Sequence, residues 1–180
     1  MVRKLIIEKG RYYMESYMFF NWNDYSDDDI DLTKEEYENL LSISCKYCDT
    51  VAFFITDENV KFQEKLEPFR IAKPSNIVYP FTTKCKDEEL GIRFYKACPE
   101  LCKIMIESIG SIFEWLNARG FKNPEDPTFY RSDGSVFLDT TIHEGVLTLT
   151  PREDEDVSSI LADSRWIKTS FAKIYGNKLI

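Results

Sequence analysis

The chain lacks any long run of apolar residues, and this absence argues against a helix that spans a membrane. No apolar stretch approaches the roughly 20 residues that such a helix needs. The opening residues, MVRKLIIEKG, contain an apolar stretch too short for a secretory signal. We therefore expect a soluble, cytoplasmic protein that does not bind a membrane.

Several motifs that accompany catalysis or nucleotide binding are also missing. The sequence contains no phosphate-binding P-loop, no dinucleotide-type glycine fingerprint, no H-E-x-x-H zinc motif and no G-x-S-x-G nucleophile elbow. Histidine occurs once, as His143. The enzyme classes that depend on these motifs are therefore excluded, and a histidine-based site would have to be built around His143.

The residues that are present are typical of a folded domain with an aromatic core. Of 180 residues, 43% are hydrophobic, and they include thirteen Phe, ten Tyr and three Trp. A chain of this length buries roughly two-thirds of the surface that it exposes when unfolded, so it needs neither a metal nor a disulfide to fold. We expect residues 1–180 to form a single domain, because no repeat or long linker divides them.

The order of the predicted elements indicates an α+β fold with an antiparallel sheet. Apolar and aromatic residues predict a long strand over residues 12–22. Shorter strands are predicted over residues 2–7, 51–56, 76–81 and 91–97. The polar residues 57–69 are ambiguous and fit a short helix ended by Pro68.

The clearest helix start is at Thr33. Thr33 and Glu36 have the spacing of a capping box, and Leu32 and Tyr37 can form the hydrophobic staple beside it. Residues at helical spacing then form one face that we expect to be buried. This face consists of Tyr37, Leu40, Leu41, Ser44 and Cys48.

Pro99 opens the most apolar predicted helix, which we expect to lie at the centre of the fold. We expect it to include Leu116 and to stop at Gly120. A wide apolar stripe of this kind indicates a helix buried on most sides. The stripe consists of Leu101, Met105, Ile109, Ile112, Phe113 and Leu116.

The region after residue 127 predicts a three-stranded meander packed against the Pro99 helix. Strands over residues 128–131 and 136–142 flank a two-residue turn at Asp133 and Gly134. A third strand, over residues 146–149, follows a second turn at Glu144-Gly145.

A further helix is predicted directly after the meander. Thr150 resembles an N-cap, Pro151 a first helical residue and Glu153 part of a second capping box. This helix is expected to run to Asp163. The four acids from Glu153 to Asp156 would then lie in or near its first turn, where negative charge complements the helix dipole.

The cysteines raise the possibility of a metal site. Cys45 and Cys48 form a C-x-x-C, and Cys98 and Cys102 form a C-x-x-x-C, so these four thiolates are a candidate zinc site. These spacings are also those of residues on one helix face, and buried free cysteine is common. Without an export signal the thiols should be reduced. We predict core thiols, with no metal and no cofactor.

The stretch RSDGSVFLDTTIHEG, residues 131–145, raises the possibility of a catalytic site. Asp139 and His143 share one face of the predicted strand but lie about 13 Å apart along an extended chain, too far to form a hydrogen bond. Glu144 lies beside His143 in the hairpin corner. We predict a polar turn without catalytic residues; the alternative is a small hydrolase that uses His143 with Asp139 or Glu144.

The net charge of −8 is concentrated in one segment. Between Asp24 and Glu38, eight acids accompany a single lysine. This balance disfavours direct nucleic-acid binding, which needs a basic surface. The run NDYSDDDID resembles a calcium loop, but it lacks the central Gly and the terminal Glu of an EF-hand.

The acidic segment is a candidate docking surface for a basic protein, because aromatic anchors within a charged rim are typical of protein interfaces. The alternative is a solvated loop that keeps the chain soluble. The predicted partner-binding residues are Trp22, Asp24, Tyr25, Asp27, Asp28, Asp29, Asp31 and Glu35.

Two stretches resemble a known class of proteins. The run DPTFYRSDGSVFLDTTIHEGVLTLTPREDED, preceded by IFEWLNARGFKNPE, resembles the C-terminal part of small bacterial immunity proteins from polymorphic-toxin and contact-dependent inhibition systems. The helix opening LTKEEYENLLSISCKYCD is also similar to such proteins. The resemblance implies a protein that neutralises a cognate toxin domain by tight binding. It implies no particular functional residues, because immunity proteins dock through variable surfaces.

The sequence therefore predicts an acidic toxin inhibitor, and not an enzyme. A basic toxin would be attracted by the acidic segment, and complementary charge accelerates association. Two alternatives come from other classes. One is the small hydrolase described above, and the other is a non-catalytic adaptor or a zinc-stabilised module that uses the thiols.

Overall fold

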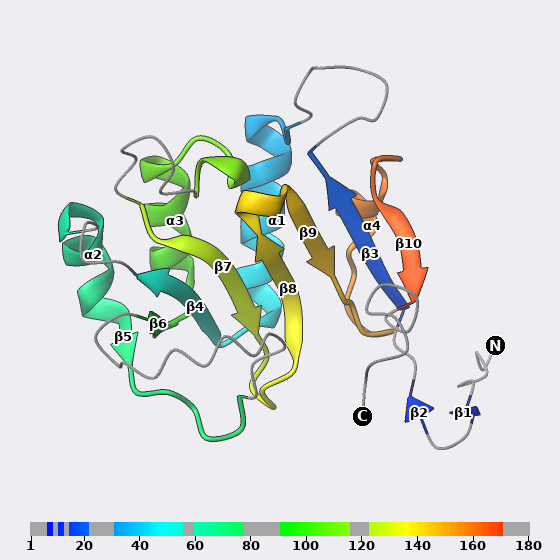
Figure 1. The fold of residues 1–180 in the computed structure, drawn as a ribbon, viewed down its shortest axis with the longest axis horizontal. Helices are drawn as coiled ribbons and strands as arrows, with labels where there is room; N and C mark the ends of the chain where they lie inside the picture. The colour runs from blue at the N-terminus through cyan, green and yellow to red at the C-terminus, as the bar shows by residue number, and fades with distance from the viewer. Residues whose placement is uncertain are drawn as a thin grey trace.

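An eight-stranded antiparallel sheet forms the centre of the fold in the computed structural model, which describes residues 7–8, 11–12, 15–21, 31–55, 60–77, 91–115 and 123–170 (Figure 1). Across the sheet the strands are β10 (Ile167–Ser170), β3 (Glu15–Phe20), β9 (Val146–Leu149), β8 (Val136–Thr141), β7 (Glu125–Tyr130), β4 (Thr50–Ile55), β6 (Gly91–Lys96) and β5 (Arg70–Ile71). Strands from both ends of the described chain thus join one sheet. A separate short ladder pairs β1 (Ile7–Glu8) with β2 (Arg11–Tyr12).

Four helices accompany the sheet in the described part of the chain: α1 (Lys34–Tyr47), α2 (Val60–Leu66), α3 (Pro99–Ser108) and α4 (Ser158–Leu161). Helices α1 and α3 pack against each other and lie on the same side of the sheet (Figure 1). The predicted α+β class with an antiparallel sheet is therefore confirmed. No helix among the described residues has the length and apolarity that a membrane crossing requires.

Helix α1 begins where the capping box predicts. The Thr33 hydroxyl accepts a hydrogen bond from the Glu36 amide at 3.3 Å, and the Glu36 carboxylate accepts one from the Thr33 amide at 2.7 Å. These bonds satisfy two amides that would otherwise lack partners at a helix start. The predicted buried face is also confirmed, because Tyr37, Leu40, Leu41 and Ser44 are buried.

The main core lies between the sheet and the helices and is rich in aromatic rings. The Trp115 indole donates a hydrogen bond of 2.9 Å to the Tyr37 hydroxyl, and both side chains are buried. Phe53 of β4 stacks on Trp115, and Phe62 of α2 meets the Trp115 ring edge-on, each with centroids 5.2 Å apart. Such contacts favour one arrangement of the core because ring pairs have preferred geometries. A second, smaller cluster of buried residues is separate from this core and consists of Ala52, Ile77, Phe94 and Tyr130.

The prediction that one helix continues from Pro99 to Leu116 is wrong. Helix α3 ends at Ser108, and Ile109 has an extended backbone. The Gly110 amide donates to the Glu114 carboxylate at 2.9 Å, and the Ser111 hydroxyl caps a new 3-10 turn that begins at Ile112. The chain bends here because Gly110 and Ser111 favour a turn with these local hydrogen bonds over a continued helix. Leu116 and Gly120 lie outside the described residues.

Strands β7, β8 and β9 are neighbours in chain order and pair antiparallel. The turn between β7 and β8 is one residue longer than predicted: the Arg131 amide bonds to the Ser135 carbonyl at 2.9 Å, and the Gly134 amide bonds to the Arg131 carbonyl at 2.9 Å. Gly134 has a φ of 82°, and a Cβ there would lie 2.3 Å from the Asn76 carbonyl oxygen. Glycine is therefore required at this position both for conformation and for space. Helix α1 contacts β8, and the packing of the meander on the Pro99 helix stays a prediction.

The helix predicted over residues 150–163 is reduced to the four residues of α4. Residues Glu153–Glu155 form a turn, and α4 begins only at Ser158. The Thr150 hydroxyl bonds to Ser16 at 3.2 Å instead of capping a helix. The Thr150 carbonyl accepts a hydrogen bond of 2.6 Å from the Arg131 guanidinium. Arg131 thus bonds to the carbonyl that would accept the first hydrogen bond of the predicted helix.

Other predicted strands are shifted or only partly described. The strand predicted over residues 12–22 is divided between β2 and β3, with residues 13–14 and 22 outside the described residues. Only residue 7 of the strand predicted over residues 2–7 is described, and it lies in β1. Of the strand predicted over residues 76–81, the two described residues lie in or directly after a turn.

Candidate functional site

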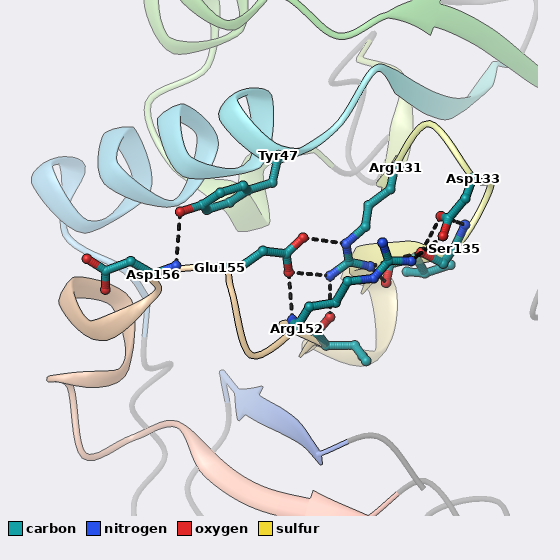
Figure 2. A network of polar contacts seen from close by, with 9 residues as sticks. Tyr47, Arg131, Asp133, Ser135, Arg152, Glu155 and Asp156 are labelled. Atoms are coloured by element: carbon teal, nitrogen blue, oxygen red, sulfur yellow. Dashed lines mark hydrogen bonds and ion pairs between the residues drawn. The ribbon is translucent and has the colours of Figure 1, made fainter. Parts of the chain in front are cut away.

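The polar stretch after β7 is held in an internal hydrogen-bond network, which Figure 2 shows. The Arg131 and Glu155 side chains are 3% and 6% exposed and meet through two hydrogen bonds, Nε to Oε1 at 2.5 Å and Nη2 to Oε2 at 2.6 Å. The remaining donors of Arg131 bond to Ser135 Oγ and to the carbonyls of Val136 and Thr150. All five donors of the guanidinium therefore have protein partners, and none is directed at a ligand.

The same network fixes the turn that follows β9. The Arg152 amide donates to Glu155 at 2.7 Å, and the Arg152 guanidinium bonds to Asp133 and Ser135 across the hairpin turn. Burial alone would raise the pKa of Glu155, but the hydrogen bonds from Arg131 and Arg152 outweigh it and lower that pKa. Hydrogen bonds from Arg152 and Ser135 likewise lower the pKa of Asp133. These carboxylates are therefore structural anions held by arginine.

The prediction that the acids from Glu153 to Asp156 complement a helix dipole is wrong. Glu155 instead turns inward to Arg131, while Glu153 and Asp154 are exposed in the turn. The Asp156 amide donates a hydrogen bond of 2.9 Å to the Tyr47 hydroxyl at the end of α1 (Figure 2). The Asp156 carboxylate accepts from the Ser158 amide at 3.1 Å. Glu155 and Asp156 thus bond to the rest of the fold, whereas Glu153 and Asp154 remain at the surface without a helix beneath them.

The structure places His143 beside Asp126, and not in contact with Asp139. His143 is 56% exposed, and its ring nitrogens lie 3.9 Å from Asp126 Oδ2 and 3.9 Å from Glu144 Oε1, beyond hydrogen-bond distance. Asp139 accepts a hydrogen bond of 3.1 Å from the Thr128 hydroxyl instead. Within the described residues, His143 therefore has no hydrogen-bonded acid of the kind that orients a catalytic base.

Asp126 and Asp139 form a pair of poorly solvated carboxyls beside this turn. Asp126 has a φ of 52° and accepts a hydrogen bond of 2.7 Å from the Ile142 amide, which holds the chain where β8 ends. Burial raises the pKa of Asp139 to about 6, and the neighbouring Asp126 charge adds to this effect. Burial also raises the pKa of Asp126, although the hydrogen bond from the Ile142 amide and the nearby His143 act to lower it. Strand periodicity places Asp139 on one face of a strand but does not reveal its pairing with Asp126, which depends on the backbone conformation of Asp126 near the start of β7.

The described thiols do not gather into a four-cysteine site. Cys48 is buried, which raises the pKa of its thiol, and the charged groups that act on that pKa are Arg131, Glu155 and Asp49. Cys45 instead lies beside Cys102 in the groove between α1 and α3. Among the residues with described positions, no three His, Cys, Asp or Glu side chains are arranged to hold a metal ion. Cys85 lies outside those residues.

Of the eight predicted partner-binding residues, two can be placed. Asp31 is tied to the fold: its carboxylate accepts from the Leu32 amide at 2.6 Å and from the Ser111 hydroxyl, and its carbonyl accepts from Arg165 at 2.9 Å. Glu35 is exposed in the first turn of α1. The six others lie outside the described residues: Trp22, Asp24, Tyr25, Asp27, Asp28 and Asp29.

Two described residues, one before the acidic segment and one within it, are anchored to the fold. The Asn21 amide, before the segment, donates to the Gly145 carbonyl at 2.9 Å, and the Asp31 carboxylate, within it, accepts a hydrogen bond from the Ser111 hydroxyl. Arg165 reinforces the second anchor, because it also pairs with Glu36 at 2.7 Å and with Asp163 at 2.7 Å. Sequence reasoning missed Arg165, since its partners on α1 are more than a hundred residues away in the chain.

No protein-family model, curated protein or solved structure matches this chain.

Proposed function

We propose that this chain is an immunity protein that neutralises a basic toxin domain in the cytoplasm by binding it through the acidic segment. The observation that carries the proposal is the concentration of charge: eight acids and one lysine between Asp24 and Glu38. A surface of this kind attracts a basic partner from a distance and raises the association rate.

The anchoring of the segment supports a binding role. Asn21, just before the segment, bonds to the Gly145 carbonyl, Asp31 within it bonds to Ser111, and Glu35 is displayed on the first turn of α1. A group held by the fold, such as Glu35, loses less conformational freedom when a partner docks. The aromatic residues Trp22 and Tyr25 supply the large anchors that dominate interface energies.

The contacts of the other polar groups fit the same role. Arg131, Glu155, Asp133 and Arg152 bond to one another or to nearby backbone, which makes them structural. His143 has no hydrogen-bonded acid within the described residues. A protein that acts by occupying a partner's surface needs a stable scaffold and a complementary face, and no reacting groups.

The test starts from the proteins encoded by the genes adjacent to this one, among which we expect a toxin domain. We expect that domain to arrest growth when produced alone, to be tolerated when this chain is produced with it, and to co-purify with this chain at a fixed stoichiometry. A His143→Ala variant should protect equally well, which separates binding from catalysis by the histidine. If the neighbouring domain is neither bound nor neutralised by the folded chain, the proposal is wrong.

A further inference from the structure

Cys45 and Cys102 bring two thiols together in a groove between α1 and α3. The groove has a volume of about 970 Å³ and is open along the two helices. Cys102 is buried at 5% exposure, and Cys45 is partly buried against the main core. Lining side chains from α1 include Glu38, Ser42 and Cys45, and those from α3 include Cys102, Lys103 and Ile106.

The helical repeat directs these thiols toward one another. On α1, Glu38, Ser42 and Cys45 are spaced by four and three residues, so they share one face. On α3, Cys102 and Ile106 share the face that lines the same groove. Because α1 and α3 pack directly on each other, the two thiols, one from each helix, line the same groove and form a side-chain hydrogen bond.

The two thiols are chemically unequal. Cys45 donates a hydrogen bond to the Cys102 sulfur, and the Ser42 hydroxyl donates a second, and these bonds lower the pKa of Cys102. The same hydrogen bond, together with burial, raises the pKa of Cys45. Cys102 also lies in the first turn of α3, where the positive end of the helix dipole stabilises a thiolate. Cys102 is therefore the nucleophile of the pair, and Cys45 is its proton-bearing neighbour.

We propose that Cys102 and Cys45 form a peroxide-sensitive dithiol that closes to a disulfide across α1 and α3. The Cys102 thiolate attacks a hydroperoxide, so that the O–O bond breaks, the sulfur becomes a sulfenic acid and hydroxide leaves when the oxidant is hydrogen peroxide. The Cys45 thiol then attacks the sulfenic sulfur, the S–S bond forms, and water leaves with the Cys45 proton. Both sulfurs are oxidised, and one peroxide is reduced to hydroxide and water; the hydroxide becomes a second water when it takes up the proton that Cys102 released on forming the thiolate.

The groove gives this site a route for the oxidant that Cys48 lacks. Hydrogen peroxide is close to water in size, and the groove reaches both Cys45 and Cys102. Cys48 is 3% exposed and does not line the groove. Cys98, at the N-cap of α3, does not line it either. These two cysteines serve as matched controls within the same protein.

The test is to treat the folded, reduced chain with hydrogen peroxide and to map the thiols by mass spectrometry without reduction. Cleavage after Lys46 separates Cys45 from Cys48, and cleavage after Glu100 separates Cys98 from Cys102. We expect a crosslinked peptide pair that contains Cys45 and Cys102, a loss of two hydrogen atoms in mass, and full recovery on treatment with a dithiol reductant.

Variants distinguish the roles of the two sulfurs. Cys45→Ser should leave a Cys102 sulfenic acid that reacts with dimedone, whereas Cys102→Ser should abolish both the crosslink and that adduct. Cys48→Ser and Cys98→Ser should form the crosslink at the rate of the unmodified chain. The proposal is overturned if a different pair of cysteines forms the disulfide. It is also overturned if Cys102 in the folded chain resists a peroxide concentration that oxidises free cysteine.

Discussion

Arg131 at the end of β7 and Glu155 in the turn before α4 form a buried ion pair with two hydrogen bonds of 2.5 and 2.6 Å. The pair joins the edge of the β7–β8 hairpin to the chain that leaves β9, and its position below Tyr47 is visible in Figure 2. A charge removed from water at this site is tolerated only because its partner and several backbone groups accompany it. The pair therefore holds the hairpin, the turn after β9 and the end of α1 in one arrangement.

The first prediction concerns Arg131. Arg131→Met should lower the free energy of unfolding by about 3–5 kcal/mol, because it leaves the Glu155 carboxylate buried without its cation. The measurement is equilibrium unfolding in urea at neutral pH. The double variant Arg131→Met, Glu155→Leu should recover part of this loss, since it removes both charges. A loss below about 1 kcal/mol in the single variant would mean that water reaches the site.

The second prediction concerns pH and Asp139. The folded-state pKa of about 6 lies above the ordinary value of 3.8, so the folded protein binds this proton more tightly than the unfolded chain. The resulting destabilisation is fully present above pH 6 and disappears as pH falls toward 3.8. Asp139→Asn should therefore stabilise the protein at about pH 7.5, by on the order of 1–3 kcal/mol, and much less at about pH 4.

The control for Asp139 is Asp154→Asn, which neutralises an exposed acid in a turn. Its effect on the free energy of unfolding should be small and nearly the same at both pH values. If Asp139→Asn is as neutral as Asp154→Asn at about pH 7.5, Asp139 is better solvated than its position beside Thr128 and Asp126 implies.

The parts of the fold that could be predicted from sequence are those fixed by neighbours in the chain. The capping box of Thr33 and Glu36 depends on residues three apart and gives the start of α1 correctly. The turn at Gly134 could be placed because aspartate followed by glycine favours it, although its length was wrong by one residue. In both cases the decisive hydrogen bonds are local.

The parts that could not be predicted depend on distant partners. Thr150, Pro151 and Glu153 form a convincing local helix start, yet Arg131, nineteen residues before Thr150, takes the Thr150 carbonyl and prevents it. The carboxylate of Asp31, a predicted partner-binding residue, bonds to Ser111, a contact eighty residues away in the chain that sequence does not reveal. The bend at Gly110 is different, because its hydrogen bond to Glu114 is local, and apolar periodicity alone does not show it.

The third prediction concerns His143. His143→Ala should change the free energy of unfolding by less than about 1 kcal/mol, because the ring is exposed and makes no short hydrogen bond. Neutralisation of the partner should be unchanged in the growth assay. Should this variant fold and bind normally yet lose its biological effect, His143 is catalytic and the hydrolase alternative is favoured.

The fourth prediction concerns the charges that steer association. Asp28→Asn together with Asp29→Asn should slow association with the basic toxin domain at about 20 mM salt and should weaken its salt dependence. Dissociation should change less, since rim charges contribute more to encounter than to the lifetime of the complex. Asp31 is left intact, because its carboxylate holds Leu32 and Ser111 and its loss would confuse folding with binding.

The matched control for these charges is Glu153→Gln together with Asp154→Asn. This variant removes the same charge from another exposed turn and spares the buried Glu155 and the Asp156 cap. Stopped-flow association at about 20 and about 150 mM salt compares both variants with the unmodified chain. The segment variant should lose several-fold in rate at low salt, while the control should lose clearly less, because steering depends on charge close to the docking face. Equal rates for the two variants at both salt concentrations would place the docking face away from the acidic segment, which would then serve as solvated surface.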